Sequence, residues 1–182
     1  MGLPANTLSL SEFLEWENRQ AQRHEFHHGE VFAMVGARRA HGRVVLNLGR
    51  RIAEALEGSP CQAFVENMKV QIAQDTVLYP DVFVTCDGAD LATDMIFTAP
   101  SLVLEVLSPT TQAYDRSQKF ALYRRLPSLR EYVLVDPETR RVEAFRRTEQ
   151  GQWVLDDMSE AAELVLPCID ARIPMAQVFE GL

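Results

Sequence analysis

The sequence predicts an α/β protein in which short strands and amphipathic helices share one core. Segments with helical spacing of their apolar residues alternate with short segments rich in β-branched and aliphatic residues. An apolar strand is predicted at Ser101–Leu107 and another at Glu131–Val135, with a helical segment between them. A strand, a helix and a second strand in this order can place the two strands side by side in parallel, which is typical of an α/β sheet.

Two helices are predicted in the first third of the chain. Leu8–Arg19 has amphipathic spacing, with Ser9 or Ser11 as a candidate N-cap and Glu12 near its start, where a carboxylate suits the helix dipole. The second helix, Ala40–Leu56, places apolar residues on one side and arginines on the other. The apolar residues are Val45, Leu48, Ile52, Ala55 and Leu56, and the arginines are Arg39, Arg43 and Arg50.

Strands are predicted for much of the remaining chain. No repeat, low-complexity tract or flexible linker interrupts them, so we expect one domain over residues 1–182. A third helix is predicted at Thr111–Leu126. The predicted strands are His24–Phe26 and Glu30–Val35, which form a hairpin, then Gln62–Glu66, Met68–Ala73, Leu78–Cys86, Ser101–Leu107, Glu131–Val135, and a closing hairpin of Arg141–Arg147 with Gln152–Leu155.

The composition limits the classes of function. No basic start with an apolar run marks a secretory signal, and no apolar run is long enough to span a membrane, so a cytoplasmic protein is expected. Cys61, Cys86 and Cys168 are odd in number and widely spaced, which predicts buried thiols in a reducing compartment instead of a zinc site or a disulfide framework. The net charge of −8 counts against a general nucleic-acid coat, because nonspecific affinity comes from Lys and Arg.

Two carboxylates are the first candidate site residues. Asp81 follows Pro80 at the start of a strand, and Glu105 lies near the end of the otherwise uncharged strand SLVLEVL. A carboxylate inside such a strand is costly to bury unless a cation or hydrogen-bond donors meet it. Carboxylates at the ends of adjacent strands can share one Mg²⁺. The competing interpretations are a turn residue for Asp81 and a buried ion pair with an arginine for Glu105.

Lys119 is the candidate catalytic lysine. Two residues after Glu105 stands Leu107, so a lysine that orients or deprotonates the attacking water and offsets charge on the pentavalent phosphate must come from elsewhere. Lys119 lies on one helical stripe with Asp115, Leu122 and other residues of Thr111–Leu126, which turns it inward or to a cleft rim. The alternative is a solvated surface lysine, with Asp115 as its i,i+4 ion partner.

His41 is a weaker candidate, at the start of the helix Ala40–Leu56 and on the side of Val45. A satisfied, half-buried histidine is the more frequent situation. If this helix begins beside a metal cleft, His41 can instead hydrogen-bond a phosphate or a metal-bound water. The arginines on the far side are either a solvated surface or a weak ridge for a nucleic-acid backbone.

The chain resembles the Uma2 family of restriction-endonuclease-like proteins, within the PD-(D/E)XK superfamily. The matching segments are RHEFHHGEVFAM, AHGRVVLNLGRRIAEAL, YPDVFV, SLVLEVLSPTTQAYDRSQKFALYRRLPSLREYVLVDP and the ending VLPCIDARIPMAQVF. The resemblance implies an α/β restriction-endonuclease-like fold with a mixed sheet flanked by helices. It also implies metal binding by Asp81 and Glu105, and a lysine moved from the strand position, here Leu107, to the helix position Lys119.

The function expected from these residues is a metal-dependent endonuclease that hydrolyses nucleic-acid phosphodiester bonds, with DNA as the expected substrate and Mg²⁺ or Mn²⁺ as cofactor. A homodimer is plausible, since cutting both strands usually requires two sites. One alternative is a non-catalytic nucleic-acid-binding or assembly module that retains the fold, which the acidic net charge favours. Another is a nuclease for RNA or a small nucleotide, which contacts fewer phosphates.

Overall fold

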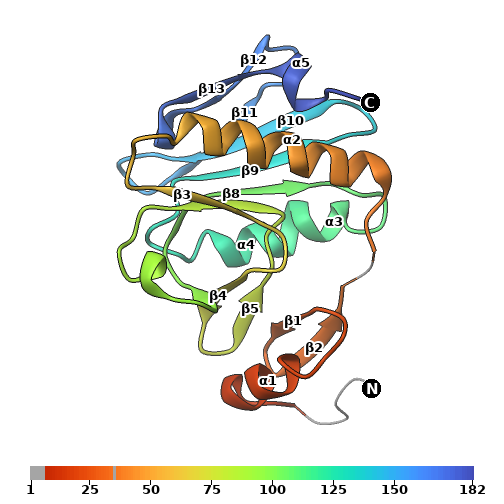
Figure 1. The fold of residues 1–182 in the computed structure, drawn as a ribbon, viewed down its shortest axis with the longest axis vertical. Coiled ribbons are helices and arrows are strands. Elements are labelled where there is room, and N and C mark those ends of the chain that lie inside the picture. Colours follow the sequence, from red (N-terminus) through yellow and green to blue (C-terminus); the bar gives the residue numbers. More distant parts are fainter. Residues whose placement is uncertain (1–6, 35) are drawn as a thin grey trace.

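This computed structural model describes residues 7–34 and 36–182 (Figure 1). The expectations for the first six residues, and for Val35 at the end of Glu30–Val35, lie outside the described residues. No helix among the described ones combines the length and the apolar character that crossing a membrane requires.

The elements follow one another along the chain with few long connections. They are α1 (Leu10–Glu17), β1 (His24–His27), β2 (Glu30–Ala33), α2 (Arg39–Ala55), β3 (Gln62–Val65), β4 (Lys69–Ala73), β5 (Thr76–Leu78), β6 (Val82–Thr85), η1 (Asp90–Ala92), β7 (Ile96–Phe97), β8 (Pro100–Val106), α3 (Gln112–Tyr114), η2 (Asp115–Lys119), α4 (Phe120–Tyr123), β9 (Glu131–Asp136), β10 (Arg141–Arg147), β11 (Trp153–Asp157), β12 (Glu163–Leu166), η3 (Pro167–Ile169), β13 (Ala171–Pro174) and α5 (Met175–Val178).

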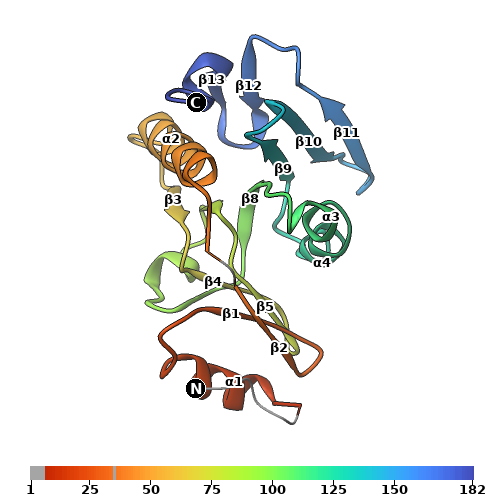
Figure 2. The ribbon, with the colours of Figure 1, turned by 90° about the vertical axis from the view of Figure 1, so that its right-hand side faces the viewer.

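A mixed sheet of six strands, in the order β11-β10-β9-β8-β6-β3, forms the centre of the molecule. The predicted parallel pair is confirmed, because β8 runs parallel to β9, while the other neighbours are antiparallel. Helix α2 covers one face of this sheet, and the helical segment from α3 to α4 covers the other (Figure 2). The predicted α/β class with a mixed sheet flanked by helices is therefore confirmed.

Strand β8 shows how the two faces divide the core. Leu104 and its alternate neighbours pack with α2, whereas Val103 and Leu107 pack with Leu122 and the rest of the α4 side. Side chains along a strand alternate between its faces, so Glu105 shares the face of Val103 and Leu107. It is thereby turned toward the segment that carries Lys119.

A second sheet, in the order β2-β1-β5-β4-β7, carries helix α1. Ser9 caps α1 and forms a reciprocal capping box with Glu12, as one of the two predicted caps. Phe13 of α1 packs on Phe26 of β1 and Val77 of β5 in a small core of its own. In Figure 1, α1, β1 and β2 lie at the opposite end of the molecule from β12 and β13.

Two element predictions need correction. The single strand predicted at Leu78–Cys86 is two strands in different sheets, because β5 ends at Leu78 and β6 begins at Val82. Pro80, which lacks an N–H and cannot extend a ladder, lies in the break. The helix predicted at Thr111–Leu126 ends at Tyr123 and contains a π-helical turn, η2, over Asp115–Lys119. π-helical turns are rare in proteins, and those that occur are often found at functional sites.

The prediction of three free thiols is wrong. Cys61 and Cys86 form a disulfide, with their Cα atoms 4.0 Å apart, and Cys168 is the free cysteine of the described chain. Gln62 pairs with Thr85 in the antiparallel ladder of β3 and β6, so the residues just outside this pair stand opposite each other. The separation of 25 residues in sequence hides this proximity, which depends on the strand pairing. The cysteine count therefore gives no argument for a reducing compartment.

Candidate active site

Asp81 and Glu105 stand opposite each other on neighbouring strands. The antiparallel register pairs Val82 of β6 with Leu104 of β8, so Asp81, which precedes Val82, stands opposite Glu105, which follows Leu104. The backbone N–H of Val106 donates a hydrogen bond of 2.7 Å to Asp81 Oδ2, which fixes the Asp81 carboxylate beside the end of β8. Glu105 is only 2% exposed. The two residues predicted from the sequence thus meet at one end of the central sheet.

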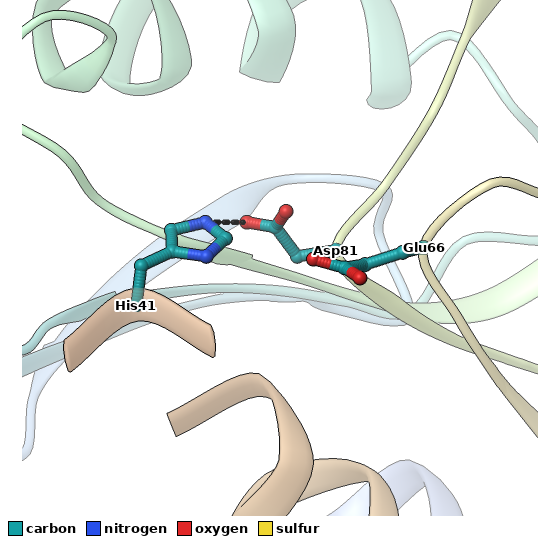
Figure 3. Close-up of side chains that lie close together, drawn as sticks. All are labelled: His41, Glu66 and Asp81. Carbon is teal, nitrogen blue, oxygen red and sulfur yellow. Dashed lines mark hydrogen bonds and ion pairs between the residues drawn. The ribbon is translucent and has the colours of Figure 1, made fainter. Parts of the chain in front are cut away.

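His41 and Glu66 also lie close to Asp81. His41 Nε2 is 3.2 Å from Asp81 Oδ2, and the first turn of α2 presents the imidazole to the carboxylate (Figure 3). One ligand atom from each of His41, Glu66 and Asp81 lies within 4.8 Å of the other two. Carboxylate oxygen is a donor suited to Mg²⁺ and Mn²⁺, whereas imidazole nitrogen suits softer ions such as Zn²⁺. We call these three residues the Asp81 cluster.

The backbone after β3 explains how Glu66 reaches this position. Glu66 and Asn67 both have positive φ, at 37° and 54°, in the turn between β3 and β4. The Glu66 N–H also donates a 3.0 Å hydrogen bond to the Asp81 carbonyl oxygen. A left-handed conformation is unusual for glutamate and often accompanies a functional turn. The turn therefore brings an exposed carboxylate back to Asp81.

Lys119 is turned inward, as the helical stripe predicted. Its Nζ lies 3.1 Å from Glu105 Oε1, 3.0 Å from Glu25 Oε1 and 3.7 Å from Asp115 Oδ1. All four side chains are at least nine-tenths buried, with exposed fractions between 2% and 9%. The interpretation of Lys119 as a solvated surface residue is wrong for this structure. Asp115 is the i,i+4 partner expected for that case, but it is the most distant of the three carboxylates.

Burial and charge act together on the groups around Lys119. Burial raises the pKa of Glu105 well above its ordinary value; Lys119 opposes this shift, and Asp81 adds to it. Burial alone would lower the pKa of Lys119, but Glu105 and Glu25 raise it, and the net shift is well above the ordinary value. These directions favour the charged ammonium form of Lys119 and the protonated form of Glu105.

Among the described residues of the site, acidic side chains outnumber basic ones. Five carboxylates face only the ammonium of Lys119 and the imidazole of His41; they are Glu25, Glu66, Asp81, Glu105 and Asp115. Buried Oε1 atoms of Glu105 and Glu25 are in ion-pair range of Lys119 but not aligned for a hydrogen bond, and neither has a hydrogen-bond partner among the described residues. Such unsatisfied buried oxygens are costly, and a divalent cation would offset the cost. The donor set fits Mg²⁺ or Mn²⁺.

Two residues of this site, Glu25 and Glu66, were not predicted from the sequence. Glu25 comes from β1 of the second sheet and reaches Lys119 from a segment 94 positions earlier in the chain. A charged side chain beside apolar Phe26 in a predicted strand is the available signal, and it is a weak one. Glu66 has only the neighbouring Asn67 as a turn signal.

Two of the three predicted far-side arginines of α2, Arg39 and Arg50, make contacts elsewhere in the protein. Arg50 pairs with Glu54 and Glu180, and Arg51 also contacts Glu54. Arg39 donates a hydrogen bond to the carbonyl of Gly181. These contacts fasten the C-terminal segment to α2, so they favour a surface role over the predicted ridge for a nucleic-acid backbone.

Known proteins match the chain over most of its length. The Uma2 family, described as "Putative restriction endonuclease", matches residues 10–175. Two proteins of Synechocystis sp. carry the description "Uncharacterized protein". One, slr1290, is 34% identical over 98% of this chain and 95% of its own length, and the other, sll1609, is 35% identical over 86% of this chain and 91% of its own.

A crystal structure from Anabaena variabilis has the same fold. It is described as a putative nuclease belonging to DUF820, and it superimposes with a TM-score of 0.79 at 17% identity, covering 94% of this chain and 97% of the other. At that identity the similarity establishes the fold, and it agrees with the nuclease-like architecture expected from the sequence.

Proposed function

The chain belongs to the Uma2 family of restriction-endonuclease-like proteins, and from this premise we propose that it is a metal-dependent endonuclease that hydrolyses phosphodiester bonds in DNA. The observation that carries the proposal is the placement of Asp81 opposite Glu105 in the strand register, with Lys119 Nζ 3.1 Å from Glu105. Residues of this kind serve phosphoryl chemistry, where positioning and charge do most of the catalysis.

Asp81 and Glu105 are the proposed metal ligands, with His41 and Glu66 as further donors beside Asp81. A bound Mg²⁺ or Mn²⁺ supplies Lewis-acid polarisation of a phosphoryl oxygen and a more acidic water. The Val106 N–H holds Asp81 in place for this role. His41 Nε2 contacts the same oxygen, Asp81 Oδ2, and so also fixes the orientation of that carboxylate.

Lys119 contributes positive charge to the reacting phosphate. Its ammonium lies 3.1 Å from Glu105, so it stands beside the proposed metal ligands. Because Glu105 and Glu25 raise the pKa of Lys119, we assign this side chain the role of a positively charged group and not that of the base that removes a proton. Lys119 would then orient the attacking water and offset charge on the pentavalent phosphate.

A plasmid-nicking assay tests the proposal. Supercoiled DNA is incubated with the wild type in Mg²⁺, in Mn²⁺ and in EDTA, and with the variants Glu105→Gln and Glu54→Gln. Glu54 is an exposed carboxylate on α2 and serves as the matched control. We expect nicking by the wild type and by Glu54→Gln in both metals, and none in EDTA or by Glu105→Gln. Equal nicking by Glu105→Gln would overturn the proposal.

The main alternative is a non-catalytic nucleic-acid-binding or assembly module, and the net charge of −8 is the observation that favours it. This alternative predicts DNA binding without nicking in any metal. Preference for RNA over plasmid in the same assay would indicate the third interpretation. Cutting of both strands would further indicate a symmetric pair of chains.

A further inference from the structure

The chain contains only two lysines, Lys69 and Lys119, and both are buried, with exposed fractions of 5% and 6%. Lys119 is surrounded by carboxylates, as described above. Lys69, at the start of β4, makes no ion pair with any carboxylate of the described residues. Burying an ammonium group is costly unless an anion or strong acceptors meet it. Lys69 is therefore a buried cation without a carboxylate partner among the described residues.

Lys69 lines a pocket of about 360 Å³ between the end of α1, the β3–β4 turn and the segment before β7. The lining residues are Asn18, Arg23, Asn67, Met68, Lys69, Asp94 and Met95. The partners of Lys69 Nζ are weak: Asn18 Oδ1 lies 3.4 Å away, and the centre of the Tyr79 ring 5.9 Å away. The pocket thus holds a buried cation and two side-chain amides.

A second cation strengthens the positive character of this pocket. Arg23, which also lines it, forms no ion pair or side-chain hydrogen bond within the described residues. Burial, and then Arg23, lower the pKa of Lys69, and Glu17 opposes them only in part. Glu17 is not available as a direct partner, because it already accepts hydrogen bonds from the His24 N–H, the His24 ring and the Tyr79 hydroxyl.

The polar side chains that line the pocket are suited to bind a phosphate group. A guanidinium matches phosphate oxygens in two-point contacts, an ammonium adds a point charge, and amide N–H groups donate to the remaining oxygens. Asp94 is an exposed residue of the lining and forms no ion pair with Lys69 or Arg23 among the described residues.

The position of the pocket connects it to the candidate active site. Glu66 belongs to the Asp81 cluster, and the next residue, Asn67, lines the pocket. Both residues are in the left-handed turn between β3 and β4. A nucleic-acid strand whose scissile phosphate lies at Asp81 would carry further phosphates past this turn. A local pair of cations would also supply affinity that the acidic protein otherwise lacks.

We propose that the pocket of Lys69, Arg23, Asn18 and Asn67 binds a backbone phosphate of the nucleic-acid substrate next to the cleaved one. The proposal rests on the proposed nuclease function for the identity of the ligand. It names Lys69 and Arg23 as substrate-binding residues that take no part in the chemical step.

Fluorescence anisotropy with a labelled DNA duplex in EDTA tests this binding without cleavage. The variants are Lys69→Met, which keeps an apolar stem, Arg23→Gln, and Arg172→Gln as a control, since Arg172 is exposed on β13. In each pocket variant, the slope of log K against log salt should be less steep by about 0.9 than in the wild type. If the variant and the wild type bind equally at about 1 M salt, this change corresponds to about an eightfold loss of affinity at about 0.1 M salt. Arg172→Gln should leave the salt slope and the affinity unchanged.

The outcomes separate this proposal from the proposed function. A wild-type slope and affinity in folded Lys69→Met or Arg23→Gln would overturn the pocket assignment, even if the protein nicks plasmid. A reduced slope in a protein that fails to nick would support the pocket and contradict the nuclease. If Lys69→Met does not fold, as judged by its melting curve, half-buried Arg23 provides the test.

Inorganic phosphate distinguishes the source of the ligand. Stabilisation of the wild type by free phosphate, lost in Lys69→Met, together with DNA binding that does not depend on Lys69, would assign the pocket to free phosphate and overturn the nucleic-acid proposal. DNA binding too weak to measure in the wild type would overturn it as well.

Discussion

Two glutamates, Glu105 and Glu131, lie on the neighbouring parallel strands β8 and β9, and each is 2% exposed. Glu131 faces the α2 side with Val133 and is fully satisfied: Arg146 Nε lies 2.9 Å from its Oε1, and the Cys168 N–H donates to its Oε2 at 3.1 Å. Glu105 faces the other side, shares one lysine with two more carboxylates and has an Oε1 without a hydrogen bond.

The difference shows what burial of a carboxylate can mean. A buried ion pair with an arginine, the interpretation that competes for Glu105, is what the structure shows at Glu131. Both are acidic residues of short apolar strands, so burial alone does not separate them. The balance of charge and hydrogen bonds around each carboxylate does, because the surroundings of Glu131 are neutralised and those of Glu105 are not.

The largest expected effect is on cleavage by variants of the two proposed metal ligands. Asp81→Asn and Glu105→Gln should each abolish metal-dependent nicking without lowering the melting temperature in EDTA, because clustered carboxylates repel one another when no cation is bound. Mg²⁺ should raise the melting temperature of the wild type only. Nicking assays and melting curves with and without metal measure both. A large loss of stability in EDTA would place Glu105 in the same structural class as Glu131.

The next effect concerns Lys119. Lys119→Ala should leave metal binding nearly intact and lower the cleavage rate by roughly 10²–10⁴-fold. Adding Leu107→Lys should recover part of the rate, since Leu107 shares the face of Glu105, although Leu107 is buried and its replacement will reduce stability. Single-turnover cleavage at saturating Mg²⁺ gives the rates. Full activity of Lys119→Ala would remove the lysine from the proposed mechanism.

Glu131 should respond in the opposite way from Glu105. Glu131→Gln should leave cleavage unchanged and cost roughly 1.5–3 kcal/mol of stability, because it removes a charged hydrogen-bond partner of Arg146. For a domain of this size the melting temperature should fall by roughly 3–12 °C. Melting curves of Glu131→Gln and Glu105→Gln in EDTA make the comparison directly. Equal melting temperatures for the two variants would contradict the difference in stability expected between Glu131→Gln and Glu105→Gln.

Glu25 gives the smallest expected effect. Its contact with Lys119, 3.0 Å from Nζ, assigns it a positioning role for that ammonium. Glu25→Gln should slow cleavage by roughly tenfold, inside the ~0.5–3 kcal/mol coupling of residues in contact, and should add nothing in a Lys119→Ala background. Glu30→Gln, an exposed glutamate of the same hairpin, is the control. Equal losses in both backgrounds would show that Glu25 does not act through Lys119.

Sequence patterns correctly predicted the helices and strands that depend on residues close together in the chain. The capped α1, the amphipathic α2 and the parallel pair of β8 and β9 follow from caps, helical spacing and the helix between two apolar strands. The strand predicted at Leu78–Cys86 was wrong, because its residues suit a strand throughout and only Pro80 marks the crossing between sheets. The disulfide of Cys61 and Cys86 depends on a strand pairing that sequence spacing does not reveal.

The candidate site divides in the same way. Asp81, Glu105 and Lys119 each carry a local signal: a strand entry, a charge inside an apolar strand and a place on a helical stripe. Glu25 and Glu66 become neighbours of these residues only through a second sheet and a left-handed turn. Side chains brought in by long-range packing are therefore the part of the site that required the structure.

Isothermal titration of Mn²⁺ into the metal-free protein tests the central claim most directly, because the surplus of carboxylates around Glu105 is the basis for the cation site. The titration compares the wild type with Asp81→Asn and with Glu131→Gln. We predict saturable Mn²⁺ binding by the wild type and by Glu131→Gln, and its loss in Asp81→Asn. Failure of the wild type to bind Mn²⁺, or unchanged binding by Asp81→Asn, would contradict the account.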